Sequence, residues 1–189
     1  MGIGALKPGV RAVFLDRDGV LNRAIVRDGK PYPPASAAEM ELQPDAERSL
    51  QHLKEAGFRL LVVTNQPDVA RGIQTTGEVE AIHERIRSVL PVDEFLVCYH
   101  DDGDGCACRK PKPGLLFEAA RRYGLNLKDC FLIGDRWRDI DAAHASGCPA
   151  VWIDYHYREH GPTFPPEARV SSLEEAVGFI VATAGRNKT

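Results

Sequence analysis

A short apolar run, Val13 to Leu15, stops at the sequence Asp-Arg-Asp-Gly of residues 16–19. A buried parallel strand ends in this way at the edge of a sheet, where ligands bind. Residues i and i+2 of an extended strand point in the same direction, so Asp16 and Asp18 are expected to face one pocket. Neighbouring carboxylates repel each other unless a cation or a proton separates them, which suits a divalent cation and a phosphorylated substrate. The alternative is a solvated turn after a strand.

Strand and helix patterns alternate along the rest of the chain. Apolar runs predict strands at 58–63, 95–98, 130–133 and 150–153, and helical spacing predicts helices at 46–53, 75–90, 113–123, 137–147 and from 171 or 172 onward. Residues 184–189 are expected to fray. Such alternation implies right-handed crossovers and a mostly parallel sheet between two helix layers. The predicted fold class is therefore α/β, a Rossmann-like three-layer sandwich.

Three of these strands run directly into polar residues. They are Asp16 and Asp18 after the first strand, Thr64 and Asn65 after the second, and Asp135 and Asp139 after the fourth. The carboxyl ends of parallel strands share one edge of a sheet, and ligands bind there. Recurrence of polar groups at these ends favours a functional site over a solvated turn.

Two connections bear on whether a lid covers this edge. Residues 23–44 carry Pro31, Pro33 and Pro34, and they are expected to form an ordered loop because proline fixes φ and removes a donor. Neither residues 22–44 nor residues 66–109 leave room for a separate folded lid. We therefore expect a single domain over residues 1–189 that has no cap and an open site.

Length and composition suit a soluble protein of one domain. The chain has 189 residues, of which 43% are hydrophobic and 27% charged. A net charge of −3 gives no electrostatic reason to expect nucleic acid or a membrane as partner. No apolar run could span a bilayer or serve as a signal peptide, so we expect a cytoplasmic protein, and we expect it to be a monomer. Five cysteines then indicate metal binding or free thiols rather than disulfides.

A loop at about residues 98–108 collects three thiols and an imidazole. The four side chains are Cys98, His100, Cys106 and Cys108. A Cys₃His set is typical of a closed, tetrahedral, structural zinc site. Reduced thiols in a solvated loop are the alternative, and an iron–sulfur cluster is disfavoured by the single imidazole. Arg109 and Lys110 follow Cys108 directly, so zinc would fix where these two cations emerge.

Four signatures resemble the haloacid dehalogenase superfamily of phosphohydrolases. They are Asp16-Arg17-Asp18-Gly19, Thr64-Asn65, Lys110, and Gly134-Asp135 with Asp139. The resemblance sharpens at residues 64–72 and at the run Cys106-x-Cys108-Arg109-Lys110-Pro111-x-Pro113-Gly114. These stretches are similar to the branch that contains heptose 1,7-bisphosphate 7-phosphatases and histidinol-phosphate phosphatases. The resemblance implies a requirement for Mg²⁺, and the spacing of the cysteine loop predicts a structural role for Zn²⁺.

The resemblance also implies roles for individual residues. Asp16 would accept the phosphoryl group, and Asp18 would protonate the leaving oxygen and later deprotonate the attacking water. Mg²⁺ would be held by the carboxylates of Asp16 and Asp135 and by the backbone carbonyl of Asp18. Thr64 and Lys110 would bind the transferring oxygens. The further candidates for substrate binding are Arg17, Asn65, Gln66, Arg109 and Arg136.

Two departures from the branch bear on substrate choice. The loop after Asn22 is longer and richer in proline than usual, and Arg136 stands where the heptose enzymes usually have lysine. We expect a phosphomonoester hydrolase acting through an aspartyl phosphate, with D-glycero-D-manno-heptose 1,7-bisphosphate as substrate. Histidinol phosphate is the alternative substrate, although its phosphatases are often fused to a second catalytic domain. A zinc-stabilised binding module without turnover is the alternative outside enzymes, and the intact Asp16 argues against it.

Overall fold

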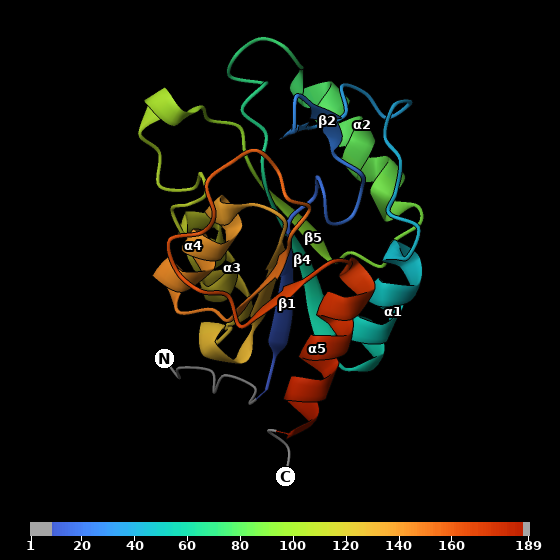
Figure 1. Ribbon diagram of the computed structural model, residues 1–189, viewed down its shortest axis with the longest axis vertical. Helices are drawn as coiled ribbons and strands as arrows, with labels where there is room; N and C mark the ends of the chain where they lie inside the picture. The colour runs from blue at the N-terminus through green and yellow to red at the C-terminus, as the bar shows by residue number, and fades with distance from the viewer. Residues whose placement is uncertain (1–8, 187–189) are drawn as a thin grey trace, which may run out of the picture.

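A six-stranded sheet lies at the centre of the computed structural model, which describes residues 9–186 (Figure 1). The strands run in the order β5-β4-β1-β6-β7-β8, and every neighbouring pair is parallel. Their bounds are β1 Arg11–Leu15, β4 Phe58–Asn65, β5 Glu94–Cys98, β6 Phe131–Gly134, β7 Ala150–Ile153 and β8 Ala168–Val170. All carboxyl ends therefore meet at one edge, as the sequence predicts.

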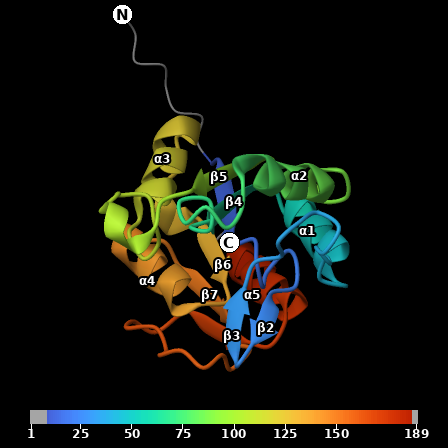
Figure 2. The same ribbon diagram turned by 90° about the horizontal axis from the view of Figure 1, so that it is seen from above.

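Five helices cover the two faces of the sheet. They are α1 Ala46–Glu55, α2 Thr76–Arg87, α3 Gly114–Tyr123, α4 Trp137–Ser146 and α5 Leu173–Arg186. Alternate residues of β1 enter different cores: Val13 and Leu15 pack with α1, α2 and α5, whereas Ala12 and Phe14 pack with α3 and α4. Figure 2 shows these two helix groups on opposite sides of the sheet. The predicted three-layer sandwich is confirmed.

Residues 23–44 differ from the predicted loop. Strands β2 (Ile25–Arg27) and β3 (Lys30–Tyr32) pair as an antiparallel hairpin. The turn at Asp28 and Gly29 has positive φ at both positions, 52° and 76°, which is the geometry that Asp-Gly favours between two strands. The hairpin stands at the carboxyl end of the main sheet (Figure 1). An Asp-Gly pair was the sequence signal that could have predicted it.

The other departures are small. Strand β8 was not predicted, because three partly exposed residues give no clear pattern. Helix α5 continues to Arg186 with Ala184 buried, so fraying from residue 184 is wrong as far as 186. Residues 1–8 and 187–189 lie outside the described part of the chain, and with them the expectations that the N-terminus is not a signal peptide and that residues 187–189 fray.

Between β1 and α3 the described chain contains no separate lid. Residues 22–45 and 66–109 hold the hairpin, α2, β5 and a single 3₁₀ turn at Asp102–Asp104. Helix α2 opens on a capping box, in which Thr75 Oγ1 accepts from the Glu78 amide at 3.2 Å and the Glu78 carboxylate accepts from the Thr75 amide at 2.7 Å. Within residues 9–186, no helix has the length and apolar character that crossing a bilayer requires.

Candidate active site

The ends of β1 and β6 and the first turn of α4 bring three buried carboxylates together. Asp16 follows β1, Asp135 follows β6, and Asp139 lies at the third position of α4. They are 7%, 2% and 1% exposed, and their potential ligand oxygens lie within 4.8 Å of one another. Such a cluster cannot stay fully ionised without nearby positive charge.

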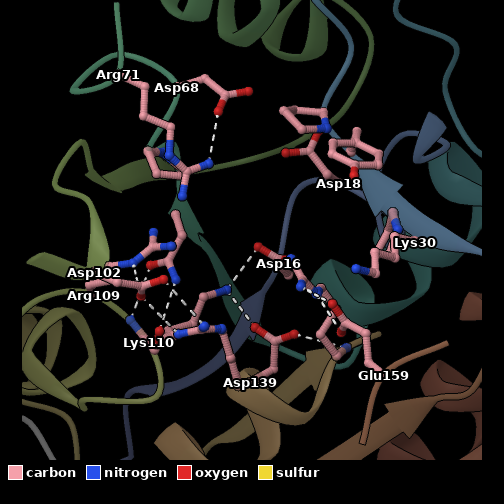
Figure 3. Close-up of a pocket in the computed structure, with 17 residues that line it drawn as sticks. Asp16, Asp18, Lys30, Asp68, Arg71, Asp102, Arg109, Lys110, Asp139 and Glu159 are labelled. Carbon is pink, nitrogen blue, oxygen red and sulfur yellow. Dashed lines mark hydrogen bonds and ion pairs between the residues drawn. The ribbon is translucent and has the colours of Figure 1, made fainter. Parts of the chain in front are cut away.

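Lys110 supplies part of that charge. Its Nζ lies 2.8 Å from Asp16 Oδ1, 2.5 Å from Asp139 Oδ1 and 2.7 Å from the carbonyl oxygen of Val63 (Figure 3). Burial alone would lower the pKa of Lys110, but the carboxylates of Asp139 and Asp16 raise it above its usual value. Lys110 therefore remains an ammonium, and one ammonium among three carboxylates leaves the cluster negative.

The cluster fits a hard divalent cation. Burial raises the pKa of Asp16 to about 6, although Lys110 opposes the shift. Burial, with Asp16 and Asp139 nearby, also raises the pKa of Asp135. Neither carboxylate oxygen of Asp135 has a hydrogen bond of ordinary geometry within the described residues, although the nearby Tyr157 hydroxyl opposes the rise of its pKa. Buried oxygens that are not fully hydrogen-bonded, in a negative cluster, suit Mg²⁺.

Gly19 shows how closely the backbone approaches this cluster. A Cβ at that position would lie 1.9 Å from Asp135 Oδ2, and the residue has φ +94°. Asp139 was noted in the sequence but not assigned to the metal. Its signal was its position in the first turn of the helix that follows β6, which places its carboxylate at the same edge of the sheet as Asp135.

Asp18 is held apart from the three carboxylates. Both its oxygens accept from Arg17 at 2.9–3.1 Å, one also accepts from Asn22 at 3.0 Å, and the other from Gln66 at 2.8 Å. Its side chain is 15% exposed. Asp16 and Asp18 both line one pocket, as predicted (Figure 3).

That pocket has a volume of about 270 Å³ and a lining rich in cations. They are Lys30, Arg71, Arg109, Lys110, Arg136 and Arg138. Five of the six pair with carboxylates: Asp68 and Asp101 bind Arg71, Asp102 binds Arg109 and Arg138, Glu159 binds Arg136, and Asp16 and Asp139 bind Lys110. Lys30, on the hairpin, has no carboxylate within 4.0 Å among residues 9–186. These carboxylates hold most of the pocket cations in fixed positions before an anion binds.

The predicted substrate-binding residues divide into two groups. Asn65, Arg109 and Arg136 line the pocket, whereas Arg17 and Gln66 are fully buried behind it. The structure therefore does not bring Arg17 and Gln66 to the substrate, because both side chains are used in hydrogen bonds to Asp18.

Two predicted residues act on their neighbours. Thr64 is 1% exposed, lies outside the pocket lining, and accepts a hydrogen bond from Gln66 at 2.8 Å. Asn65 grips the backbone of Lys110 from both sides. Its Nδ2 donates to the Lys110 carbonyl at 3.0 Å, and its Oδ1 accepts from the Lys110 amide at 3.1 Å. Lys110 is thereby attached to the end of β4.

The four side chains of the cysteine loop converge as predicted. Cys98 Sγ lies 3.7 Å from Cys106 Sγ and 3.2 Å from Cys108 Sγ, and His100 Nδ1 lies 3.6 Å from Cys98 Sγ. A tetrahedral zinc with Zn–S bonds of about 2.3 Å separates its sulfurs by about 3.8 Å. The arrangement fits a closed Cys₃His site. The remaining cysteines, Cys130 and Cys148, are buried free thiols.

Comparison with known proteins gives the same assignment as the residues. The sequence model of the haloacid dehalogenase-like hydrolase family matches residues 30–147. D-glycero-beta-D-manno-heptose-1,7-bisphosphate 7-phosphatase of Bordetella bronchiseptica is 36% identical over 152 residues, covering 76% of this chain and 80% of the relative. D-glycero-alpha-D-manno-heptose-1,7-bisphosphate 7-phosphatase of Mycobacterium bovis is 35% identical, covering 75% of this chain and 78% of the relative.

A solved structure extends the likeness to the fold. It is the D,D-heptose 1,7-bisphosphate phosphatase of B. bronchiseptica complexed with magnesium and phosphate. It superposes with a TM-score of 0.77 at 29% identity, covering 93% of this chain and all of that one. The chain belongs to the haloacid dehalogenase-like hydrolase family. The superfamily predicted from the four signatures and the fold class predicted from the alternation of strands and helices are confirmed.

Proposed function

We propose that the protein is a Mg²⁺-dependent phosphatase that removes one phosphate from D-glycero-D-manno-heptose 1,7-bisphosphate through an aspartyl-phosphate intermediate. The observation that carries this proposal is the buried cluster of Asp16, Asp135 and Asp139, with Lys110 paired to the first and the last of them, at the edge of a cationic pocket. The named relatives support the substrate. They carry different anomers in their names, so the proposal extends to the heptose and not to its anomer.

The metal ligands proposed are the carboxylates of Asp16 and Asp135, with Asp139 beside them, and the backbone carbonyl of Asp18. Bound Mg²⁺ supplies the positive charge that lets a carboxylate approach a phosphate dianion. Lys110 contributes a second positive charge at Asp16, where negative charge shifts during transfer. Thr64 lies near the end of β4 and does not line the pocket in the unbound structure. Its hydroxyl is proposed to hold a phosphoryl oxygen when substrate is bound.

The chemistry proceeds in two half-reactions. An oxygen of Asp16 attacks phosphorus, the bond from phosphorus to the sugar oxygen breaks, and Asp18 gives that oxygen a proton. Water then attacks the phosphorus of the aspartyl phosphate while Asp18 takes the proton from the water. Free phosphate leaves, and Asp16 and Asp18 return to their starting forms.

The second phosphate of the substrate is proposed to lie against the pocket arginines. Arg109 is 9% exposed, and its buried Nη1 has no hydrogen-bond partner within the described chain. An arginine fork suits a phosphate that is held without being transferred. Arg136 and Lys30 line the same pocket and offer further contacts.

The zinc site is proposed to be structural. Cys98, His100, Cys106 and Cys108 would fill all four positions of a tetrahedral ion, which leaves no place for substrate. Its proposed function is to fix the loop from which Arg109 reaches the pocket. We also propose that the protein works in the reducing cytoplasm, which the free thiols support. We further propose that it is a monomer.

The decisive experiment measures phosphate release across a panel of phosphorylated metabolites with Mg²⁺. Heptose bisphosphate, histidinol phosphate and a simple aryl phosphate are the essential members. We expect the highest kcat/KM on the heptose bisphosphate, and phosphorus NMR should count one phosphate released per molecule. Preference for histidinol phosphate, or removal of both phosphates at similar rates, would assign the other substrate. A protein that releases phosphate from none of them would be a binding module.

A further inference from the structure

Arg17 is a charged side chain with no exposed surface, between two carboxylates of the site. Its Nε and Nη2 donate to both oxygens of Asp18 at 2.9–3.1 Å. Burial of a guanidinium is unfavourable unless its charge is paired and its donors are used. The contact with the Asp18 carboxylate pairs the charge of Arg17, and His83 accepts from one of its remaining donors.

His83 lies behind Arg17 on α2, and it too is fully buried. Its Nε2 is 3.3 Å from Arg17 Nη1, and its Nδ1 is 3.3 Å from Glu80 Oε1. Burial, together with the charge of Arg17, lowers the pKa of His83 to about 4, so the ring is neutral at neutral pH. The partners assign the tautomer: Nδ1–H donates to Glu80, and Nε2 accepts from Arg17.

The ring of His83 has little freedom to turn. It stacks on Phe95 of β5 with a centroid distance of 4.3 Å and an interplanar angle of 26°. Glu80 also accepts from the hydroxyl of Tyr99 at 2.8 Å, and Tyr99 stands between Cys98 and His100 of the zinc cluster. Phe95 and Glu80 thus hold the His83 ring, and with it the Nε2 atom that accepts from Arg17, in one orientation.

The guanidinium fork of Arg17 constrains where the Asp18 carboxylate lies. Asn22 and Gln66 each hold a single oxygen of Asp18, whereas Arg17 contacts both oxygens from one rigid, planar group and so adds a direct constraint on the carboxylate plane. Asp18 follows Asp16 by two residues, yet its oxygens are not among the carboxylates that gather around Lys110. An unheld carboxylate so close to that cluster could bind the cation instead of the substrate's leaving oxygen.

We propose that Arg17, oriented by His83, is a positioning residue that holds the Asp18 carboxylate outside the metal cluster and in the plane from which it exchanges a proton. The inference rests on the proposed function, because it requires proton transfer by Asp18. The same alternation that points Asp16 and Asp18 toward the pocket points Arg17 away from it.

The test compares two esters that differ in their need for an acid. The leaving oxygen of an alkyl phosphate, the heptose bisphosphate or whichever alkyl ester of the panel the wild type hydrolyses, requires a proton. That of 2,4-dinitrophenyl phosphate does not. General acid catalysis is worth about 10²–10⁴-fold, so a misplaced Asp18 should lose part of this on the alkyl ester alone.

The variants are Arg17→Met, His83→Leu and His83→Gln. We expect kcat on the alkyl ester to fall about 100-fold in Arg17→Met and about 10-fold in His83→Leu, with less than about a threefold fall on the dinitrophenyl ester. His83→Gln retains an acceptor for Arg17 and should recover most of the loss. His144→Leu is the matched control, because His144 stacks on Phe164 at 3.6 Å from an exposed position of α4.

Several outcomes separate the possibilities. Equal losses on the two esters, or no loss on either, overturn the positioning role while the proposed function stands. A wild type that hydrolyses neither ester overturns the proposed function, and this inference with it. Should Arg17→Met fail to fold, the pair His83→Leu and His83→Gln decides: selective loss with rescue supports the role, and loss without rescue overturns it.

Discussion

Two groups of candidate metal ligands lie beside one pocket, and they are built in different ways. The carboxylates of Asp16, Asp135 and Asp139 are buried and come from strand ends and a helix. The cysteine cluster takes only Cys98 from a buried strand end, that of β5, and its other ligands from the loop that follows, where His100 is exposed and Cys106 half-buried. A rigid sheet keeps the first group in place without a metal, whereas the loop around the second has little apolar packing of its own. Loss of metal should therefore affect the chemistry at the carboxylate cluster and the order of the loop at the cysteine cluster.

The boundary between these regions falls between two neighbouring residues. Lys110 is attached to the core by Asn65 and by the carbonyl of Val63. Arg109 instead binds Asp102 of the loop at 2.8 Å. From the sequence, zinc was expected to fix the positions of both Arg109 and Lys110. Because Lys110 has anchors outside the cysteine loop, we now expect loss of zinc to displace Arg109 only.

The largest effect is expected on the core side, in Asp16→Asn. Turnover should fall by about 10³-fold or more on every ester, because the amide keeps the shape and loses the nucleophile. Phosphate release is the measurement. The melting temperature in metal-free buffer should stay the same or rise, since one carboxylate of a negative cluster is removed. Activity within tenfold of the wild type would remove Asp16 from this role.

Arg109→Ala tests the loop side of the boundary. A hydrogen bond to a charged group is worth about 1.5–3 kcal/mol, so kcat/KM for the bisphosphate should fall about 10–150-fold. A small aryl monophosphate should be affected much less. Asp102→Asn is the control, because it removes the partner of Arg109 but leaves the guanidinium. Equal loss on both substrates would mean that Arg109 only braces the loop.

Loss of zinc should reproduce the Arg109 pattern. We expect about one zinc per chain in the wild type and none in Cys106→Ala, by elemental analysis. The bisphosphate should lose about 10–100-fold in kcat/KM, and the aryl phosphate should stay within about threefold, because Lys110 remains attached to β4. Cys148→Ala removes a thiol outside the cluster and should keep its zinc. A fall of equal size on both esters would place Lys110 under zinc control.

The last prediction, which has the smallest expected effect on turnover, concerns how the free energy of unfolding depends on pH. The folded pKa of His83, about 4, lies below its usual value of 6.5, so the unfolded chain binds the extra proton between these values. The contribution of His83 to the free energy of unfolding should therefore be full above pH 6.5 and fall as the pH drops toward 4, by about 1–3 kcal/mol, whereas the raised pKa of Asp16 acts in the opposite direction in wild type and variant alike. Urea unfolding of the wild type and His83→Gln measures it. The variant should lose this part of the pH dependence, and identical slopes would contradict the assignment.

The sequence predicted those parts of the site that follow from local pattern and topology. Strand ends and the i and i+2 rule were enough to predict that Asp16 and Asp18 line one pocket, and cysteine spacing was enough to group the four candidate zinc ligands. Lys110 was expected only from the family resemblance. Arg17 was assigned to the substrate because it lies in a signature, although strand alternation already pointed it the other way. His83 could not be predicted, since its role depends on a helix packing beside β1, which only tertiary structure shows.

The grip of Asn65 on the Lys110 backbone has a consequence for protein engineering. The side-chain amide of Asn65 ties the backbone of Lys110 to the end of β4, so this catalytic cation has an anchor outside the cysteine loop that precedes it. The tip of that loop, at Gly103 to Gly105, has open space around it. Lengthening a surface loop is thermodynamically inexpensive, at about 0.6 kcal/mol for each doubling. Libraries randomised at this tip could therefore be screened for new ester preferences without rebuilding the catalytic centre.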